Sequence, residues 1–134
     1  MAYLLVIDDD EDFGNAVSTV LESEGHEVSV ELDPAGGLSS MEGRLPDLVI
    51  LDVIFPENDT AGFDLARTIV SDRERFKGVP ILMLTAVNKK FPLGFSEKDI
   101  DEEWLPVTDF LEKPVDLDVL KNRVAALLQK AGGA

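Results

Sequence analysis

Short apolar runs alternate with longer helix-like stretches along this chain, and the alternation restricts the possible folds more than any other feature. Three runs are continuously apolar, as in strands buried on both faces: residues 3–7, 48–51 and 81–84. Apolar residues recur at helical spacing in three longer stretches, residues 13–21, 62–76 and 116–130. A weaker helix is expected after Asp33, because Pro34 suits a first helical position while Gly36 and Gly37 disfavour the helix interior. Strands that alternate with helices form parallel sheets covered on both faces, so the sequence predicts an α/β fold.

The polarity of the strands predicts their order in the sheet. Residues 28–31 alternate apolar and polar side chains, which is typical of an edge strand, and the short run at residues 108–111 is expected at the other edge. The three continuously apolar runs then occupy the centre. A doubly wound, five-stranded parallel sheet in the order 2-1-3-4-5 satisfies these conditions. In such a sheet ligands bind beyond the carboxyl ends of the first and third strands, where the winding reverses.

Length and composition exclude several classes of protein. A chain of 134 residues fits one domain, so we expect residues 1–134 to form a single unit. It contains no cysteine, which excludes disulfides and thiolate metal sites. No basic leader precedes Tyr3 and no apolar run approaches the roughly 18 residues of a membrane span, so we expect a cytoplasmic protein without membrane contact. A net charge of −15 would repel phosphate backbones, so direct nucleic-acid binding is not expected.

Residues suited to phosphate or metal chemistry stand at the ends of four predicted strands. Asp8 and Asp9 follow the first strand, Asp52 ends the third, Thr85 ends the fourth and Lys113 follows the fifth. Because the carboxyl ends of parallel strands share one edge of the sheet, these side chains should converge.

The charges of this set call for a cation. Asp8, Asp9 and Asp52 carry −3 together, and Lys113 returns +1. Two like charges about 4 Å apart repel by about 4 kcal/mol at an effective dielectric constant of about 20. Oxygen ligands with room for water and a phosphate oxygen favour Mg²⁺ over Zn²⁺, with Mn²⁺ as a possible substitute.

These electrostatics suggest a role for each residue. Asp52 is the candidate nucleophile, a carboxylate that would form an aspartyl phosphate. Asp9 would bind the metal directly, and Asp8 would bind it directly or through water. The cation and Lys113 would neutralise charge on the transferring group, while the Thr85 hydroxyl would donate a hydrogen bond to a phosphate oxygen.

Four motifs together resemble those of the two-component response-regulator receiver domains, over almost the whole chain. They are Val6-Ile7-Asp8-Asp9, Leu51-Asp52-Val53-Ile54-Phe55-Pro56, Leu84-Thr85-Ala86 and Phe110-Leu111-Glu112-Lys113-Pro114. The resemblance implies a flavodoxin-like, CheY-like three-layer sandwich. It also implies a signalling switch that is not an enzyme beyond catalysing its own phosphorylation and slow dephosphorylation. Since the chain ends about where the last predicted helix ends, we expect no output domain in it, and it is either a stand-alone regulator or part of a longer protein.

The resemblance further implies partners and additional site residues. The phosphoryl group would come from a histidine kinase or a histidine phosphotransfer protein, with Mg²⁺ required, and the signal would pass by contact to an unidentified downstream protein. The backbone carbonyl of Ile54 would be a third protein ligand of the metal. Thr85 and Phe110 would act as the switch. Ile54, Ala86 and Val87 would border the access route to the phosphate, and the apolar side chains of Ile54 and Val87 predict slow phosphate loss.

Two segments are longer than is usual in this family. Residues 57–61 extend the loop beside the predicted site and either shape partner access or form a solvated insertion. Residues 86–106 replace the usual fourth helix, and Ser96 is expected to cap a short acidic helix there. Four apolar residues of this extension form either a docking patch or a local core: Phe91, Leu93, Phe95 and Trp104.

Two other functions remain open from the sequence. A receiver-like binding module that is never phosphorylated would share the fold, although every expected site residue is retained. A phosphatase of the haloacid dehalogenase type would use an Asp-x-Asp pattern, which Asp8 to Asp10 offers. Against that function, Asp12 stands where such enzymes usually carry Thr or Val.

Overall fold

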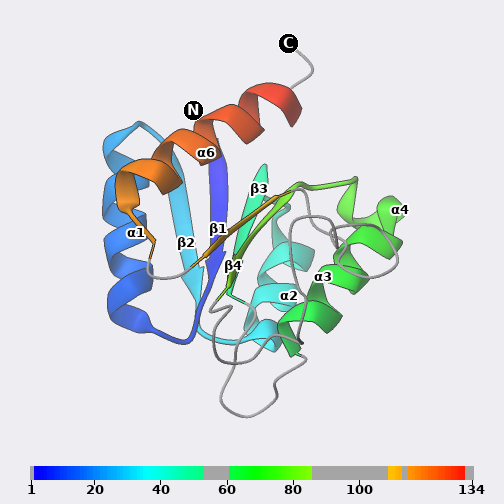
Figure 1. The fold of residues 1–134 in the computed structure, drawn as a ribbon. Helices are drawn as coiled ribbons and strands as arrows, with labels where there is room; N and C mark the ends of the chain where they lie inside the picture. Colours follow the sequence, from blue (N-terminus) through cyan, green and yellow to red (C-terminus); the bar gives the residue numbers. More distant parts are fainter. Residues whose placement is uncertain (1, 53–60, 86–108, 113–114, 132–134) are drawn as a thin grey trace.

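A computed structural model describes residues 2–52, 61–85, 109–112 and 115–131 (Figure 1). Its strands are β1 (Tyr3–Ile7), β2 (Glu27–Glu31), β3 (Leu48–Asp52), β4 (Ile81–Thr85) and β5 (Asp109–Glu112). Its helices are α1 (Glu11–Ser23), α2 (Pro34–Gly43), α3 (Ala61–Ser71), α4 (Arg73–Phe76) and α6 (Leu117–Ala131). All strand pairs are parallel, in the order β2-β1-β3-β4-β5, so the predicted fold class and strand order are confirmed.

The sheet lies between two layers of helices (Figure 1). Helices α1 and α6 cover one face, and α2, α3 and α4 cover the other. Strand β1 is buried along its whole length and alternates between the two layers. Leu4 and Val6 belong to the core beneath α1 and α6, whereas Leu5 and Ile7 belong to the core beneath α2 and α3. This double burial explains why the central strands are continuously apolar.

One predicted helix is in fact two. The stretch 62–76 was expected to be continuous, but α3 ends at Ser71 and α4 begins at Arg73. Asp72 lies between them, and its carboxylate accepts a hydrogen bond from the Arg75 amide at 3.0 Å. Aspartate competes well for such amide donors at helix starts, so it ends one helix and begins the next. Phe76 of α4 is thereby fully buried in the core beneath α3.

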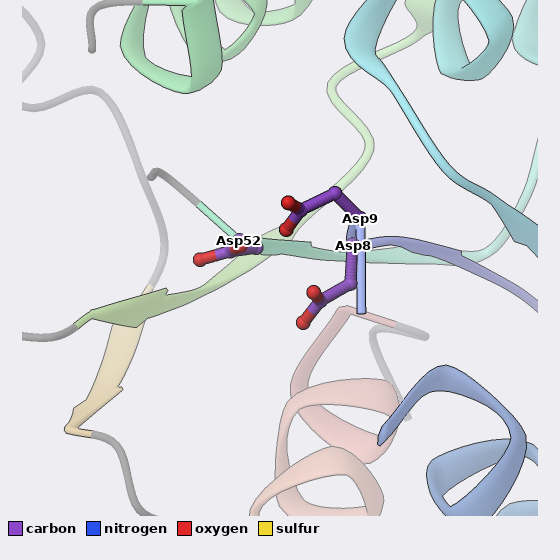
Figure 2. Close-up of side chains that lie close together, drawn as sticks. All are labelled: Asp8, Asp9 and Asp52. Carbon is purple, nitrogen blue, oxygen red and sulfur yellow. The ribbon is translucent and has the colours of Figure 1, made fainter. Parts of the chain in front are cut away.

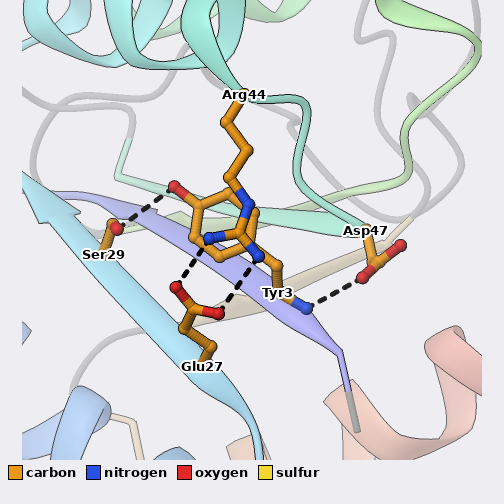
Figure 3. Close-up of polar contacts among 5 residues, drawn as sticks. All are labelled: Tyr3, Glu27, Ser29, Arg44 and Asp47. Carbon is orange, nitrogen blue, oxygen red and sulfur yellow. Dashed lines mark hydrogen bonds and ion pairs between the residues drawn. The ribbon is translucent and has the colours of Figure 1, made fainter.

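Arg44, which follows α2, ties that helix to the amino-terminal ends of β1 and β2 (Figure 3). Its guanidinium stacks 3.9 Å from the Tyr3 ring and donates to both carboxylate oxygens of Glu27, at 2.6 and 3.1 Å. The Tyr3 hydroxyl bonds the Ser29 hydroxyl at 3.1 Å, and the Tyr3 amide donates to the Asp47 carboxylate at 2.8 Å. The Arg44 hydrogen bonds hold the pKa of Glu27 below its ordinary value. This end of the sheet is therefore organised by paired groups.

Candidate functional site

Three carboxylates from two neighbouring strands meet at the carboxyl end of the sheet (Figure 2). Asp8 and Asp9 directly follow β1, and Asp52 is the last residue of β3. One carboxylate oxygen from each lies within 4.8 Å of the others. The cause is the strand register, since Ile7 pairs with Leu51 and the next residue of each strand carries the acid. The sequence-based prediction that these three residues converge is confirmed.

The three carboxylates differ in exposure. Asp8 is fully buried and Asp52 is 3% exposed, whereas Asp9 is open to solvent. Figure 2 shows the side chains of Asp8 and Asp9 leaving the chain in different directions, with the three carboxylates around a common space. Burying a charge is unfavourable unless hydrogen bonds or an opposite charge compensate for it. A buried pair at an open strand end is therefore unusual for a purely structural arrangement.

Asp8 is held by the backbone on both of its sides. Its amide donates to the Glu31 carbonyl of β2 at 3.0 Å, and its carboxylate accepts from the Asp10 amide at 2.9 Å. The turn that brings the Asp10 amide to this carboxylate also begins α1. These two contacts fix the orientation of Asp8 relative to the end of the sheet.

Asp10 serves the helix and is not part of the carboxylate group. Its carboxylate accepts a hydrogen bond from the Phe13 amide at 3.1 Å, which caps α1. Within the described residues, the group of acids close enough to share a metal ion contains Asp8, Asp9 and Asp52 and omits Asp10. Asp10, the second acid of the Asp-x-Asp pattern considered for a dehalogenase-type phosphatase, thus acts as a helix cap.

The carboxylate cluster of Asp8, Asp9 and Asp52 fits a hard divalent cation. Two unit charges 4.8 Å apart repel by about 3.5 kcal/mol at an effective dielectric constant of about 20. A bound cation converts this repulsion into attraction. Carboxylate oxygens are the donors that Mg²⁺ prefers, and the exposure of Asp9 leaves room for the water molecules that Mg²⁺ retains.

Two further predicted residues lie in the strands β4 and β5. Thr85 is the last residue of β4 and follows Leu84, whose Cα pairs with that of Asp52. The backbone of Thr85 therefore ends its strand at the same edge as the acids. Phe110 lies in β5, where it pairs with Met83 of β4. The roles predicted for the two side chains stay predictions.

The remaining predicted site residues lie outside the described residues: Ile54, Ala86, Val87 and Lys113. Residues 57–60 and the long connection at residues 86–106 also lie outside them. Their proposed roles in metal binding, phosphate access and charge neutralisation rest on the sequence alone.

Sequence reasoning missed two supports of the site. The capping role of Asp10 could have been found, because an aspartate directly before a helix is a common N-cap. The Glu31 carbonyl that receives the Asp8 amide could not, because it depends on the pairing of β1 with β2 and a backbone carbonyl has no sequence signature.

A groove of about 640 Å³ lies at the opposite, amino-terminal end of the sheet. Four of its lining residues immediately precede strands: Ala2, His26, Asp47 and Pro80. None of the three clustered carboxylates lines it. This groove and the clustered carboxylates thus lie at different ends of the sheet, and we take the carboxylates as the candidate site.

Known proteins match this chain along nearly its whole length. The sequence profile of the response regulator receiver domain matches residues 4–125. The chain is 35% identical over 130 residues to the DNA-binding dual master transcriptional regulator RpaA of Synechocystis, covering 97% of this chain and 50% of RpaA. It is 26% identical over 131 residues to protein PilH of Pseudomonas aeruginosa, covering 96% of this chain and 98% of PilH.

Solved structures agree with these sequence matches. A receiver domain of a Francisella response regulator superposes with a TM-score of 0.77 at 25% identity, covering 97% of this chain and 98% of that one. The chain spans about half the length of several curated relatives, RpaA among them. Among the described residues, no helix has the length and apolar character needed to cross a membrane.

Proposed function

Because the chain belongs to the response regulator receiver domain family, we propose that it is a phosphorylation-operated switch of a two-component phosphorelay. It would accept a phosphoryl group on Asp52 from a histidine kinase or a histidine phosphotransfer protein. The observation that carries the proposal is the meeting of Asp8, Asp9 and Asp52 at the ends of β1 and β3. The family consists of signalling modules and not of conventional enzymes, so the reaction would be limited to the domain's own phosphorylation and slow dephosphorylation.

The carboxylate cluster would hold Mg²⁺, with Mn²⁺ as a substitute. Asp9 would bind the ion directly, and Asp8 directly or through water. The resemblance to the family adds the Ile54 backbone carbonyl as a further ligand. When bound, the ion supplies positive charge that offsets both the acids and the oxygens of an incoming phosphoryl group.

Asp52 is the best placed of the three acids to act as nucleophile. Asp8 belongs to the turn that begins α1, and Asp9 is the exposed member of the cluster. Asp52 ends a buried central strand, so its carboxylate is held at a set position. An Asp52 oxygen would form a bond to phosphorus while the bond from phosphorus to the donor's imidazole nitrogen breaks. That nitrogen keeps the electron pair, and the donor leaves as a histidine.

Other residues would read the phosphoryl group once it is bound. Lys113 would pair with its oxygens, and the Thr85 hydroxyl would donate to one of them. Movement of Thr85 and Phe110 would then change a surface that a downstream protein recognises. The apolar residues Ile54 and Val87, beside Ala86, would hinder an attacking water and prolong the phosphorylated state.

We further propose that residues 1–134 form one receiver domain with an extended connection at residues 86–106. It would act in the cytoplasm by protein–protein contact, without touching nucleic acid itself. The strongly acidic surface supports this last point, since the net charge is −15.

Phosphorylation by a small donor tests the proposal. Wild-type protein, Asp52→Asn and Asp47→Asn are incubated with acetyl phosphate, with Mg²⁺ or with EDTA, and intact mass is measured. Asp47 is a matched control, because it directly precedes the same strand, β3, at its other end. Wild type and Asp47→Asn should gain one phosphoryl group from acetyl phosphate when Mg²⁺ is present and none in EDTA. Asp52→Asn should gain none under either condition. Wild-type protein that is never labelled would instead favour a binding module that works without phosphorylation.

A further inference from the structure

Gly37 brings helix α2 closer to strand β1 than a residue with a side chain could. A Cβ placed on Gly37 would lie 2.4 Å from Ile7 Cδ1 and 2.9 Å from Ile7 Cγ1. The optimal distance between two non-bonded carbon atoms is about 3.5–4.0 Å, so an alanine at this position would force Ile7 or α2 to move. By contrast, a Cβ on Gly43, at the end of the same helix, would meet nothing within 4 Å.

The contact falls on the residue that precedes the site. Ile7 is fully buried and is the last residue of β1, directly before Asp8. In the ladder, Ile7 pairs with Leu51 of β3, the residue before Asp52. On its other side Ile7 pairs with Glu31 of β2, whose carbonyl receives the Asp8 amide.

The tight packing around Ile7 leaves its side chain little room to move away from an added methyl group. Strands β2 and β3 flank its backbone, and its side chain lies in a core that includes Met41 and Leu51. Protein interiors are close-packed, so an added methyl group displaces its neighbours rather than filling a void. Beyond Ile7 the pairing with β3 ends, so a displacement of Ile7 would move the acids that follow it.

We propose that Gly37 is a positioning residue for the carboxylate cluster. Its missing side chain lets α2 pack directly on Ile7, and this contact sets the end of β1 and with it Asp8 and Asp9. The proposal deepens the proposed function and rests on the magnesium site described there. Gly37, which disfavours the helix interior, thus stands where α2 packs on Ile7, the residue before Asp8.

Magnesium affinity separates positioning from ordinary packing. Mg²⁺ titrations by calorimetry compare wild type with Gly37→Ala, Gly43→Ala and Ile81→Ala, at a temperature where all are folded. Ile81 belongs to the same core as Ile7 but begins β4, at the opposite end of the sheet, so Ile81→Ala controls for lost stability. Gly37→Ala should bind Mg²⁺ roughly tenfold more weakly, as when a metal site loses an orienting contact, and the two controls should stay within about twofold of wild type.

A compensating substitution tests the contact itself. Ile7→Val removes Cδ1, the atom nearest to the added Cβ. Gly37→Ala combined with Ile7→Val should therefore recover part of the lost affinity, since Cγ1 stays 2.9 Å from the added Cβ, whereas Gly37→Ala combined with Ile81→Val should recover none. In the metal-free protein, Gly37→Ala should also shift the amide resonances of residues 8–10, which reports position without requiring a bound ion.

Several results would overturn the proposal. One is a Gly37→Ala variant that is destabilised yet binds Mg²⁺ with wild-type affinity, and another is equal recovery by the two double variants. If Gly37→Ala does not fold, Ile7→Ala removes the contact from the strand side and should weaken Mg²⁺ binding more than Ile81→Ala; equal affinities would refute the idea. Wild-type protein that binds no Mg²⁺ would refute the magnesium site alone, and unchanged amide resonances in metal-free Gly37→Ala would then refute the positioning role separately.

Discussion

Charged side chains are arranged differently at the two ends of the sheet. At the amino-terminal end, Glu27 is matched by the Arg44 guanidinium and Asp47 by the Tyr3 amide (Figure 3). At the carboxyl end, two buried carboxylates and one exposed carboxylate are held within 4.8 Å of one another (Figure 2). The first arrangement stabilises the protein by itself. The second holds like charges close together, an arrangement that a ligand of opposite charge would stabilise.

Function accounts for the clustered charges of the carboxyl end better than stability does. Like charges at close range destabilise a fold, and proteins keep them where binding or chemistry requires them. Backbone contacts from β2 and α1 hold Asp8 in place despite the repulsion. Substitutions at the two ends should therefore have different consequences, and the comparison can be tested in that way.

The largest expected effect is on metal binding at the carboxyl end. Asp8→Asn keeps an acceptor for the Asp10 amide but removes one negative charge from the cluster. Mg²⁺ binding should weaken by about 30-fold, or about 2 kcal/mol. Calorimetric titration measures this, and Asp47→Asn serves as the control that should leave affinity unchanged. Equal affinities for wild type and Asp8→Asn would break the contrast between the two ends.

A second effect concerns the stability of the metal-free protein. Asp52→Asn removes the repulsion between a nearly buried acid and its two neighbours. Its free energy of unfolding without Mg²⁺ should rise by about 1–2 kcal/mol. This is less than the repulsion of about 3.5 kcal/mol between two fixed charges, because side chains and solvent adjust to reduce it. Urea titration in EDTA gives the value. Asp47→Asn should not be stabilised, and stabilisation of both variants to the same extent would show that the effect is not specific to the cluster.

A smaller effect is expected for the paired groups of the amino-terminal end. Arg44→Lys keeps the positive charge but loses the bidentate hydrogen bonds to Glu27 and the planar stacking on Tyr3. The melting temperature should fall slightly, because the groups are exposed and surface pairs contribute little. Mg²⁺ affinity should not change. A loss of Mg²⁺ affinity in this variant would mean that the two ends are coupled.

The smallest effect is a pH dependence of that pair. The pKa of Glu27 is lowered in the folded protein by its hydrogen bonds to Arg44, so the pair stabilises the fold above the ordinary value of 4.5. This contribution is lost as the pH falls through the lower folded value. The difference in melting temperature between wild type and Glu27→Gln should therefore be constant above about pH 5 and shrink below pH 4.5. A difference that grows on acidification would contradict the assignment.

The sequence predicted the carboxyl end far better than the amino-terminal end. Asp8, Asp9 and Asp52 could be brought together because each follows an apolar strand and parallel strands end at one edge. The Arg44–Glu27 pair joins residues 17 positions apart on the exposed surface, where many charged partners are equally plausible in a linear reading. Chemistry at strand ends is set by topology, whereas surface pairing depends on side-chain geometry.

Two local features also escaped prediction for physical reasons. The break between α3 and α4 depends on whether Asp72 caps a new helix or faces solvent, and apolar spacing does not distinguish these cases. In the sequence Gly37 indicates a weak helix, whereas in the structure it lies against Ile7. Close approach between a helix and a strand depends on the distance between elements, which one sequence does not encode locally.

The most direct test is to map which residues of the whole protein respond to Mg²⁺. Amide resonances are recorded while Mg²⁺ is added to metal-free protein, with Ca²⁺ as a second ion of larger radius. The account predicts saturable shifts centred on residues 8–10 and 52, with Glu27, Arg44 and Asp47 unaffected. Shifts centred on the amino-terminal end, or no saturable shift at residues 8–10 and 52, would contradict the claim that the clustered carboxylates form the functional site.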